Sequence, residues 1–257
     1  MTLEWTPERV RTEVMTRPRQ TPVRLPDTVV IDRPDLLQRI TPSLRQGGLN
    51  EVAFANFALD DAEAHLDEAL ERFRRAGVRY RWTVAPDSGP ADLGDRLLAR
   101  GLRRNRVHAV ARELAGLPST RPSIEVEAVT PDTVDEFSAV MAQGWGAEPK
   151  PIQRFHRAAL ESGAFRLYLS RLPDGTPVAT SASIIFPDSG SVYLLGAVVL
   201  EAHRRLGHYR ASIERRLEDA VGEGCGLAFS HALADSSAPR LHRAGFRDVY
   251  VFDSFAP

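Results

Sequence analysis

The chain has 257 residues, of which 43% are hydrophobic and 26% are charged, and its 33 basic residues nearly balance 34 acidic ones. This length fits one large domain or two domains of about 100–150 residues, and the hydrophobic fraction excludes a disordered chain. A net charge of −1 argues against a dedicated nucleic-acid-binding protein, which would be strongly basic. The single cysteine, Cys225, excludes a disulfide framework and any cysteine-based metal site.

The sequence contains no segment that predicts membrane insertion or secretion. Its longest apolar run, residues 194–200, is far shorter than the ~20 residues that span a bilayer. Residues 1–30 carry several charges and lack the apolar core of a signal peptide. We therefore expect a cytoplasmic protein that has no membrane partner.

Lysine is nearly absent, because Lys150 is the only one among 33 basic residues. Genome composition accounts for this bias without a functional reason. No G-x-x-x-x-G-K-[ST] motif surrounds Lys150, which excludes a P-loop NTPase. The motifs of zincins and serine hydrolases are absent as well.

The first half of the chain alternates helices and strands. Thr6 and Pro7 match the N-cap and first position of a helix, and residues 28–32 predict a strand after a proline-rich arm. A strand, a helix with apolar residues at helical spacing, a second strand and a second helix are then predicted, at 51–58, 60–76, 78–85 and 92–100. Gly101 fits the left-handed position that ends the last of these helices.

The second half follows a linker predicted at 114–121. It begins with a strand at 124–128 and a helix that Thr130 and Pro131 would cap and open. A second helix is then predicted at 151–161, followed by three strands at 165–171, 178–186 and 191–199. After the turn 203–207 come a helix, a strand at 227–233, a short helix ending at Gly245 and a last strand at 248–255. Short turns rich in Pro, Asp and Gly predict that the three consecutive strands pair antiparallel. The order predicts an α+β fold with a mixed sheet.

The turn at 198–211 carries the strongest functional signal. It leaves a strand and enters a helix, whose N-terminus offers unpaired N–H groups and a partial positive charge that suit a phosphate. Gly207 allows the backbone to approach a ligand closely. Basic side chains crowd this turn: His203, Arg204, Arg205, His208 and Arg210. Spacing alone also allows a solvated helix entrance that happens to be rich in arginine.

Two motifs resemble those of a known superfamily. Arg204-x-x-Gly207-x-Tyr209 resembles the acetyl-CoA pyrophosphate loop of the GNAT N-acetyltransferases. Residues 235–246, a short helix segment ending in Gly-Phe, are similar to the second conserved segment of that family. The resemblance covers about residues 122–257, and both motifs stand at the expected distance within the expected order of elements.

The resemblance implies that acetyl-CoA binds as a co-substrate. The strand 191–199 would diverge from the strand 227–233, so that the backbone of Ala197, Val198 and Val199 pairs with the pantetheine arm. The N–H groups of the following turn would surround the pyrophosphate. The cofactor-binding residues implied in this turn are Arg204, Arg205, Leu206, Gly207, His208, Tyr209 and Arg210. An amine would attack the thioester directly after losing a proton, with the amide near Val198 polarising the thioester carbonyl.

Two residues depart from the family pattern. Tyr209 replaces the second Gly or Ala of the loop, as it does in some subfamilies. Leu241 stands where many members have the tyrosine that protonates the leaving thiolate. Ser236 and Ser237 are nearer candidates for this role, and a thiolate can leave unassisted because its pKa is near ~8.5.

The general base has four candidates at strand ends near the expected cleft: Glu201, His203, His231 and Asp235. His231 is also explained as a packed or edge histidine, and Asp235 as a helix N-cap. Such enzymes often relay the proton through water, so no single residue is singled out as the base. The predicted catalytic residues are Glu201 and Asp235, as bases, and Ser237, as the acid. The resemblance implies no metal.

Trp145 and Glu148 lie between the first two helices of the second half, in a segment that covers the acceptor site in this family. They are predicted to contact the substrate. A tryptophan beside glycines is equally explained as an anchor of the loop in the core.

The first half repeats part of the same pattern. Residues 80–102 and 227–246 both contain a strand, an Asp-Ser turn, a short helix and a Gly followed by a large apolar residue. The segment before the first-half helix has no glycine and contains Asp60, Asp61 and Glu63, which would repel a pyrophosphate. We predict two GNAT-like domains, at 1–117 and 122–257, of which the first does not bind acetyl-CoA and shapes the acceptor site.

The sequence therefore predicts an acetyl-CoA-dependent N-acetyltransferase that acts on an amine of a small molecule or peptide. One alternative is a non-catalytic acyl-CoA-binding or regulatory protein, which the absence of the tyrosine allows. Another is an aminoacyl-tRNA-dependent transferase, against which the neutral charge and the intact loop both argue. A monomer or homodimer is expected, with no nucleic-acid partner.

Overall fold

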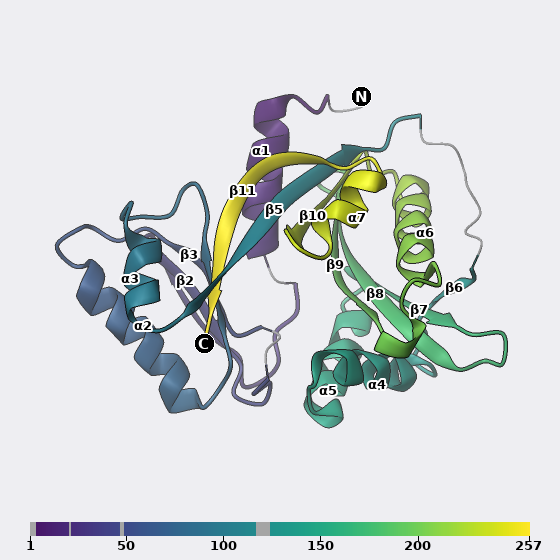
Figure 1. Cartoon of the computed structure of the whole chain (residues 1–257), viewed down its shortest axis with the longest axis horizontal. Helices are drawn as coiled ribbons and strands as arrows, with labels where there is room; N and C mark the ends of the chain where they lie inside the picture. The colour runs from purple at the N-terminus through teal and green to yellow at the C-terminus, as the bar shows by residue number, and fades with distance from the viewer. Residues whose placement is uncertain (1–3, 21, 47–48, 117–123) are drawn as a thin grey trace.

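The computed structural model describes residues 4–20, 22–46, 49–116 and 124–257. Its strands form one eleven-stranded mixed sheet in the order β1-β2-β3-β4-β11-β5-β10-β9-β8-β7-β6. Helices cover both faces, so the fold is of the α+β class with a sheet flanked by helices (Figure 1). None of the described helices is long and apolar enough to cross a bilayer.

The elements of the first half are, in chain order, α1 (Pro7–Thr16), the 3₁₀ turn η1 (Arg17–Arg19), β1 (Val29–Arg33), β2 (Leu36–Ile40), β3 (Glu51–Ala55), α2 (Ala62–Ala76), β4 (Arg81–Val84), α3 (Leu93–Ala99) and β5 (Arg103–Glu113). The predicted start of α1 is confirmed, because Thr6 Oγ1 accepts a hydrogen bond from the Arg9 N–H at 3.3 Å. Gly101 has φ +82°, as its position after α3 requires.

The second half contains β6 (Val126–Ala128), α4 (Val134–Trp145), α5 (Pro149–Glu161), β7 (Phe165–Arg171), β8 (Pro177–Phe186), β9 (Ser191–Val199), η2 (Glu201–His203), α6 (His208–Gly222), β10 (Leu227–Leu233), α7 (Ala238–Arg243) and β11 (Arg247–Ala256). The predicted antiparallel meander is confirmed by the register of β7, β8 and β9. Helices α4 and α5 pack on one face of this part of the sheet, while α6 and α7 pack on the other.

Two long strands join the halves. β5 comes from the first half but lies between β10 and β11, and β11 pairs with both β5 and β4 (Figure 1). Phe255 near the end of β11 is consequently buried in the core of the first half, beside Trp82 and Phe73. The sheet therefore runs without a break from one half to the other.

Several boundaries differ from those predicted. The helix α4 begins at Val134 rather than near Thr130, because Thr133 Oγ1 accepts from the Thr130 N–H and holds 130–133 in a turn. Ser237, not Asp235, is the N-cap residue of α7. The linker predicted at 114–121 lies outside the described residues from 117 onward.

The strands β2 and β5 were not predicted, and polar residues explain both omissions. In β2, the buried Gln38 donates through Nε2 to the Ala69 carbonyl at 2.8 Å, and the buried Arg39 pairs with Glu51. β5 begins with four exposed polar residues, 103–106, and becomes buried only from Val107 onward. Both strands owe their polar positions to tertiary partners that a local pattern does not contain.

Candidate functional site

The turn before α6 presents a row of backbone donors. Within the described part of the chain, the N–H groups of residues 205–207 have no backbone acceptor, and those of 208–210 form the unpaired first turn of α6. Arg205 and Gly207 adopt φ of +68° and +98°, which turns the backbone around the end of the helix. Such successive free N–H groups at a helix N-terminus bind anions, and phosphates in particular.

Gly207 is required for this shape for two reasons. Its φ of +98° is rarely adopted by residues with a side chain. A Cβ at this position would also lie 3.2 Å from Ile124 Cδ1, so that this side chain would have to shift by a few tenths of an ångström.

Beside this turn, β9 separates from β10. The two strands pair in parallel only at three positions, with 191–193 opposite 227–229. A register shift against β8, where Gly196 has φ +60°, bends β9 just beyond this point. From residue 194 to 199 the β10-facing edge of β9 therefore has no partner strand among the described residues. The Leu194 carbonyl accepts from Ser230 Oγ at 2.8 Å, and an extended ligand can pair with the residues that follow.

The side chains of the turn differ in where they point. Arg204 exposes 59% of its side chain, and its Nε lies 3.4 Å from the Val199 carbonyl. Arg210 is paired with Glu214 at 2.7 Å. His208 is buried, with its Nδ1 2.8 Å from Ser170 Oγ, so this residue offers only its N–H group to a ligand in the turn.

A cavity of about 560 Å³ lies between the two halves of the molecule. Apolar and aromatic side chains make up most of its wall, with contributions from both halves. Gly196 of the bent β9 lines it, which connects the cavity to the edge where the strands separate. Trp145, the last residue of α4, is 48% exposed and lines the cavity together with Glu148, the N-cap residue of α5.

Glu148 is the free carboxylate of this wall. Glu51 also lines the cavity, but Arg39 Nη1 and Arg81 Nη2 hold its two oxygens at 2.7 and 2.5 Å. Glu148 has no ion pair with any residue that the structure describes. A cationic group that enters the cavity is therefore best neutralised at Glu148.

The three predicted catalytic residues lie outside the cavity. Glu201 is in η2 with 91% of its side chain exposed, Asp235 is exposed, and Ser237 is at the N-cap position of α7 without a side-chain hydrogen bond to the helix. Of the described residues that line the cavity, none is one of these three. Leu241 is 2% exposed and packed between α7 and the sheet, so it leaves no polar group at the position of the family tyrosine.

His231 is the one base candidate in the cavity wall. Its Nε2 donates to the Val14 carbonyl at 3.2 Å and lies 3.5 Å from the Tyr250 hydroxyl. Burial, together with the charge of Arg81, lowers the pKa of His231 to about 4. The imidazole is therefore neutral near pH 7 and a weak base.

Most residues of the wall were not predicted as site residues, among them the polar Glu51, Arg81, Tyr193 and Tyr250. Burial opposes the ionisation of Glu51, but the charges of Arg81 and Arg39 lower its pKa, so it stays a carboxylate. Burial raises the pKa of Tyr193 to about 12, which keeps its phenol protonated. Because the residues come from β3, β4, β9 and β11, no local motif marks them.

The buried His156 predicts loss of stability in acid. It is 4% exposed, its Nδ1 donates to Ser138 Oγ at 2.9 Å, and burial lowers its pKa from 6.5 to about 3. Between these values the unfolded chain binds a proton that the folded protein does not, so stability falls as the pH falls below 6.5. The free energy of unfolding should lose about 2 kcal/mol from this residue at pH 5.

Urea unfolding at several pH values checks this expectation. The variant His156→Gln should show a shallower decline between pH 7 and pH 5 than the native chain. Equal slopes for the two proteins would contradict the assignment.

Comparisons with known proteins agree with this geometry. The family model described as "Acetyltransferase (GNAT) domain" matches residues 101–230, just over half of the 257-residue chain. No curated protein matches the chain.

Solved structures share the fold at low sequence identity. A GCN5-related N-acetyltransferase from Kribbella flavida is 18% identical with a TM-score of 0.59, covering 96% of this chain and 92% of that one. A tandem GNAT protein from the clavulanic acid biosynthesis pathway is 15% identical with a TM-score of 0.56, covering 97% and 87%. A functionally unknown conserved protein from Staphylococcus epidermidis is 12% identical with a TM-score of 0.62, covering 90% and 93%. The chain belongs to the GNAT acetyltransferase family.

Proposed function

We propose that the protein is an acetyl-CoA-dependent N-acetyltransferase whose second half, within 122–257, binds the co-substrate. The observation that carries this proposal is the junction of the free N–H groups at 205–210 with the unpaired edge of β9. These two features fit the two parts of coenzyme A, a doubly charged pyrophosphate and an extended amide-containing arm. When bound, acetyl-CoA supplies an activated acetyl group as a thioester.

The residues that hold the co-substrate are proposed as follows. The N–H groups of 205–210 surround the pyrophosphate, and the exposed Arg204 adds a positive charge beside it. The backbone of 197–199 pairs with the pantetheine amides. The amide near Val198 donates to the thioester oxygen, whose charge increases as the amine attacks.

The acceptor amine is proposed to enter the cavity between the halves. Its mostly apolar wall excludes water and suits an acceptor with an apolar body, while Glu148 neutralises its ammonium group. The first half contributes Arg81 and Glu51 to this wall, which supports its proposed role in shaping the acceptor site. Glu63 at the start of α2 is paired with Arg96 and Arg100, but the exposed Asp60 and Asp61 keep this helix entrance acidic and unsuited to a pyrophosphate.

The ammonium proton must leave before the amine attacks. Glu51 is a poor acceptor for this proton because it stays paired with two arginines. His231 is a poor acceptor because its pKa is about 4. We propose Glu201 and Asp235 as candidate acceptors of this proton, through water because they lie outside the cavity, and Ser237 as a candidate donor to the leaving thiolate. The leaving thiolate, with a pKa near ~8.5 in water, needs no dedicated acid.

Replacing the cavity carboxylate should weaken acceptor binding. For Glu148→Gln, the KM for a productive amine should rise about tenfold, since a charge-assisted contact contributes about 1.5–3 kcal/mol, and the Kd for acetyl-CoA should not change. The matched control is Glu161→Gln at the exposed end of the same helix, which should leave both constants unchanged. An unchanged KM in Glu148→Gln would remove the carboxylate from the acceptor site.

The release of coenzyme A from acetyl-CoA tests the function itself. Slow release alone, accelerated by members of a panel of small amines and peptides, is the result expected of an N-acetyltransferase. The second candidate is a non-catalytic acyl-CoA-binding protein, which the burial of Leu241 at the family tyrosine position favours. Saturable acetyl-CoA binding without turnover over the whole panel would support that candidate.

A further inference from the structure

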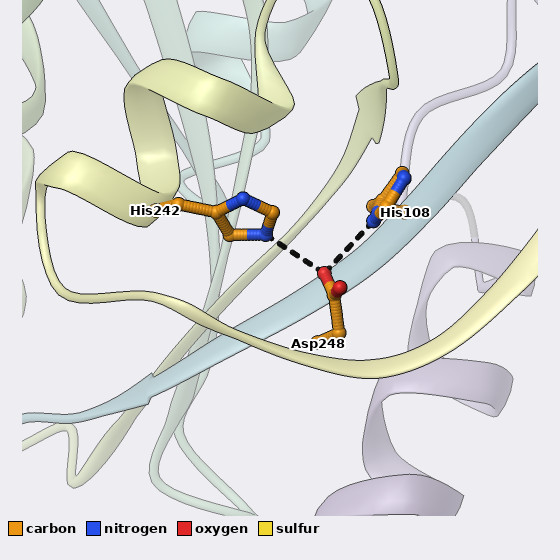
Figure 2. A group of neighbouring side chains, drawn as sticks. All are labelled: His108, His242 and Asp248. Carbon is orange, nitrogen blue, oxygen red and sulfur yellow. Dashed lines mark hydrogen bonds and ion pairs between the residues drawn. The ribbon is translucent and has the colours of Figure 1, made fainter.

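Two histidines and an aspartate meet on the face of the sheet opposite the cavity. His108 is on β5, His242 on α7 and Asp248 on β11, and their side chains point toward one another (Figure 2). His108 Nδ1 and His242 Nε2 lie 2.9 and 2.8 Å from the same oxygen, Asp248 Oδ1. Within residues 4–20, 22–46, 49–116 and 124–257, no other group of three such side chains brings its ligand atoms so close.

The cluster depends on an irregularity of β11. Asp248 is opposite Val110 and Tyr250 is opposite Ala109, so Val249 is an extra residue in the strand. In a regular strand, residues 248 and 250 would share a face. The bulge instead sends Tyr250 to the cavity and leaves Asp248 on the face of His108 and α7.

We infer that His108, His242 and Asp248 form a binding site for a late divalent transition metal ion, with Zn²⁺ as the best fit. Two imidazoles and one carboxylate are a common three-residue ligand set for zinc, with a water molecule in the fourth position. The side chains are 23%, 38% and 43% exposed, so an ion and its water can enter from solvent. Hard ions such as Mg²⁺ and Ca²⁺ favour oxygen ligands and fit the site less well.

The protonation states are compatible with ligation. Asp248 Oδ1 faces a ring nitrogen of each histidine at hydrogen-bonding distance, as a carboxylate oxygen does. In the metal-free state each imidazole donates an N–H to this carboxylate. To ligate, each ring must offer the lone pair of the nitrogen that faces Asp248, with any remaining ring proton on its other nitrogen.

The geometry requires a small adjustment. Ligand atoms of a tetrahedral zinc site are about 3.3 Å apart, so the two nitrogens must withdraw from Asp248 Oδ1 by about 0.5 Å. All three side chains are partly exposed and have room for this movement. Arg243 and Arg247 flank the ligands in sequence, but both are exposed and screened by water.

A bound ion would connect two strands that join the halves of the sheet with a helix of the second half. β5 and β11 run through both halves, and α7 belongs to the second. Zinc should therefore raise the midpoint of thermal unfolding, because it binds the folded chain and not the unfolded one. This readout does not depend on acetyl transfer.

Calorimetric titration of the chelator-treated full chain with ZnCl₂ tests the inference. We expect one site per chain, with the affinity reduced at least about tenfold in His108→Ala and in His242→Ala, and no saturable binding of MgCl₂. His203→Ala, which removes a histidine elsewhere on the surface, should bind zinc as the native chain does. Absence of zinc binding, or binding unchanged in His108→Ala and His242→Ala, would overturn the inference and leave a hydrogen-bonded triad only.

Thermal unfolding separates ligation from a folding defect. Without metal, the two alanine variants should remain folded, and zinc should raise the midpoint only for the native chain and His203→Ala. Should an alanine variant fail to fold, His242→Gln and Asp248→Asn retain polar side chains and should also bind zinc more weakly. An equal zinc-dependent rise in the native chain and all of these variants would overturn the assignment.

Discussion

Replacing Gly207 with alanine is expected to lower the affinity for acetyl-CoA at least about tenfold. The φ of +98° costs a residue with a Cβ roughly 1–3 kcal/mol, and each 1.4 kcal/mol is about tenfold in affinity. The new methyl group would also press on Ile124 Cδ1, 3.2 Å from its position. The turn then relaxes, and its N–H groups no longer point at one anion.

Gly222→Ala is the matched control for this change. Gly222 ends the same helix, has no atom within 4 Å of the place that a Cβ would occupy and does not have a positive φ. Its alanine variant should bind acetyl-CoA as the native chain does and should be at least as stable. Calorimetry that finds equal affinities in Gly207→Ala and the native chain would contradict the role of the turn.

Replacing Glu51 with glutamine is expected to destabilise the protein by about 3–5 kcal/mol, the usual cost of breaking a buried ion pair. Glu51 is 7% exposed and holds both Arg39 and Arg81, and the Arg39 side chain is itself only 4% exposed. Glutamine carries no charge to compensate a guanidinium that stays out of water. Urea unfolding at pH 7 measures the change directly.

The control for this change is a glutamate that also pairs with two arginines, but at the surface. Glu71 on α2 pairs with Arg74 and Arg75, whose side chains are 73% and 78% exposed. Glu71→Gln should change the free energy of unfolding by less than about 1 kcal/mol, as exposed ion pairs do. Similar losses in both variants would show that burial is not what makes Glu51 important.

The turn at 204–210, the proposed co-substrate site, could be predicted from the sequence because its features are local. A strand, a glycine at a fixed distance from Arg204 and a helix entrance lie within a dozen residues, and the backbone conformation follows from that order. The structure adds the physical details, namely the positive φ at Arg205 and the small space that Ile124 leaves for a Cβ at position 207. It also shows that the His208 side chain is buried, which its place in a basic run did not suggest.

The cavity and the histidine cluster were not accessible in this way. Their residues come from elements far apart in the chain. The strand β5, which carries His108, was not predicted because it begins with four exposed polar residues. The bulge in β11 places Tyr250 and Asp248 on opposite faces of the sheet, and no residue in that strand marks the position of the bulge. Both sites therefore depend on strand order and register, which only the three-dimensional arrangement supplies.

The domain division is affected by the same arrangement. A repeat of two units, 1–117 and 122–257, stays our prediction. Because β5 pairs with strands of the second half and β11 pairs with β4 of the first, each unit would lack a neighbouring strand when alone. Expression of either unit by itself should therefore yield less soluble protein than the full chain.

The most direct test of co-substrate binding at this turn is a crystal structure of the full chain with acetyl-CoA. We expect the pyrophosphate within hydrogen-bonding distance of the N–H groups at 205–210. We also expect the pantetheine arm along residues 194–199 of β9 and the acetyl group facing the cavity beside Gly196. Electron density for the ligand at any other position, or none at saturating concentration, would contradict the proposed function of the turn.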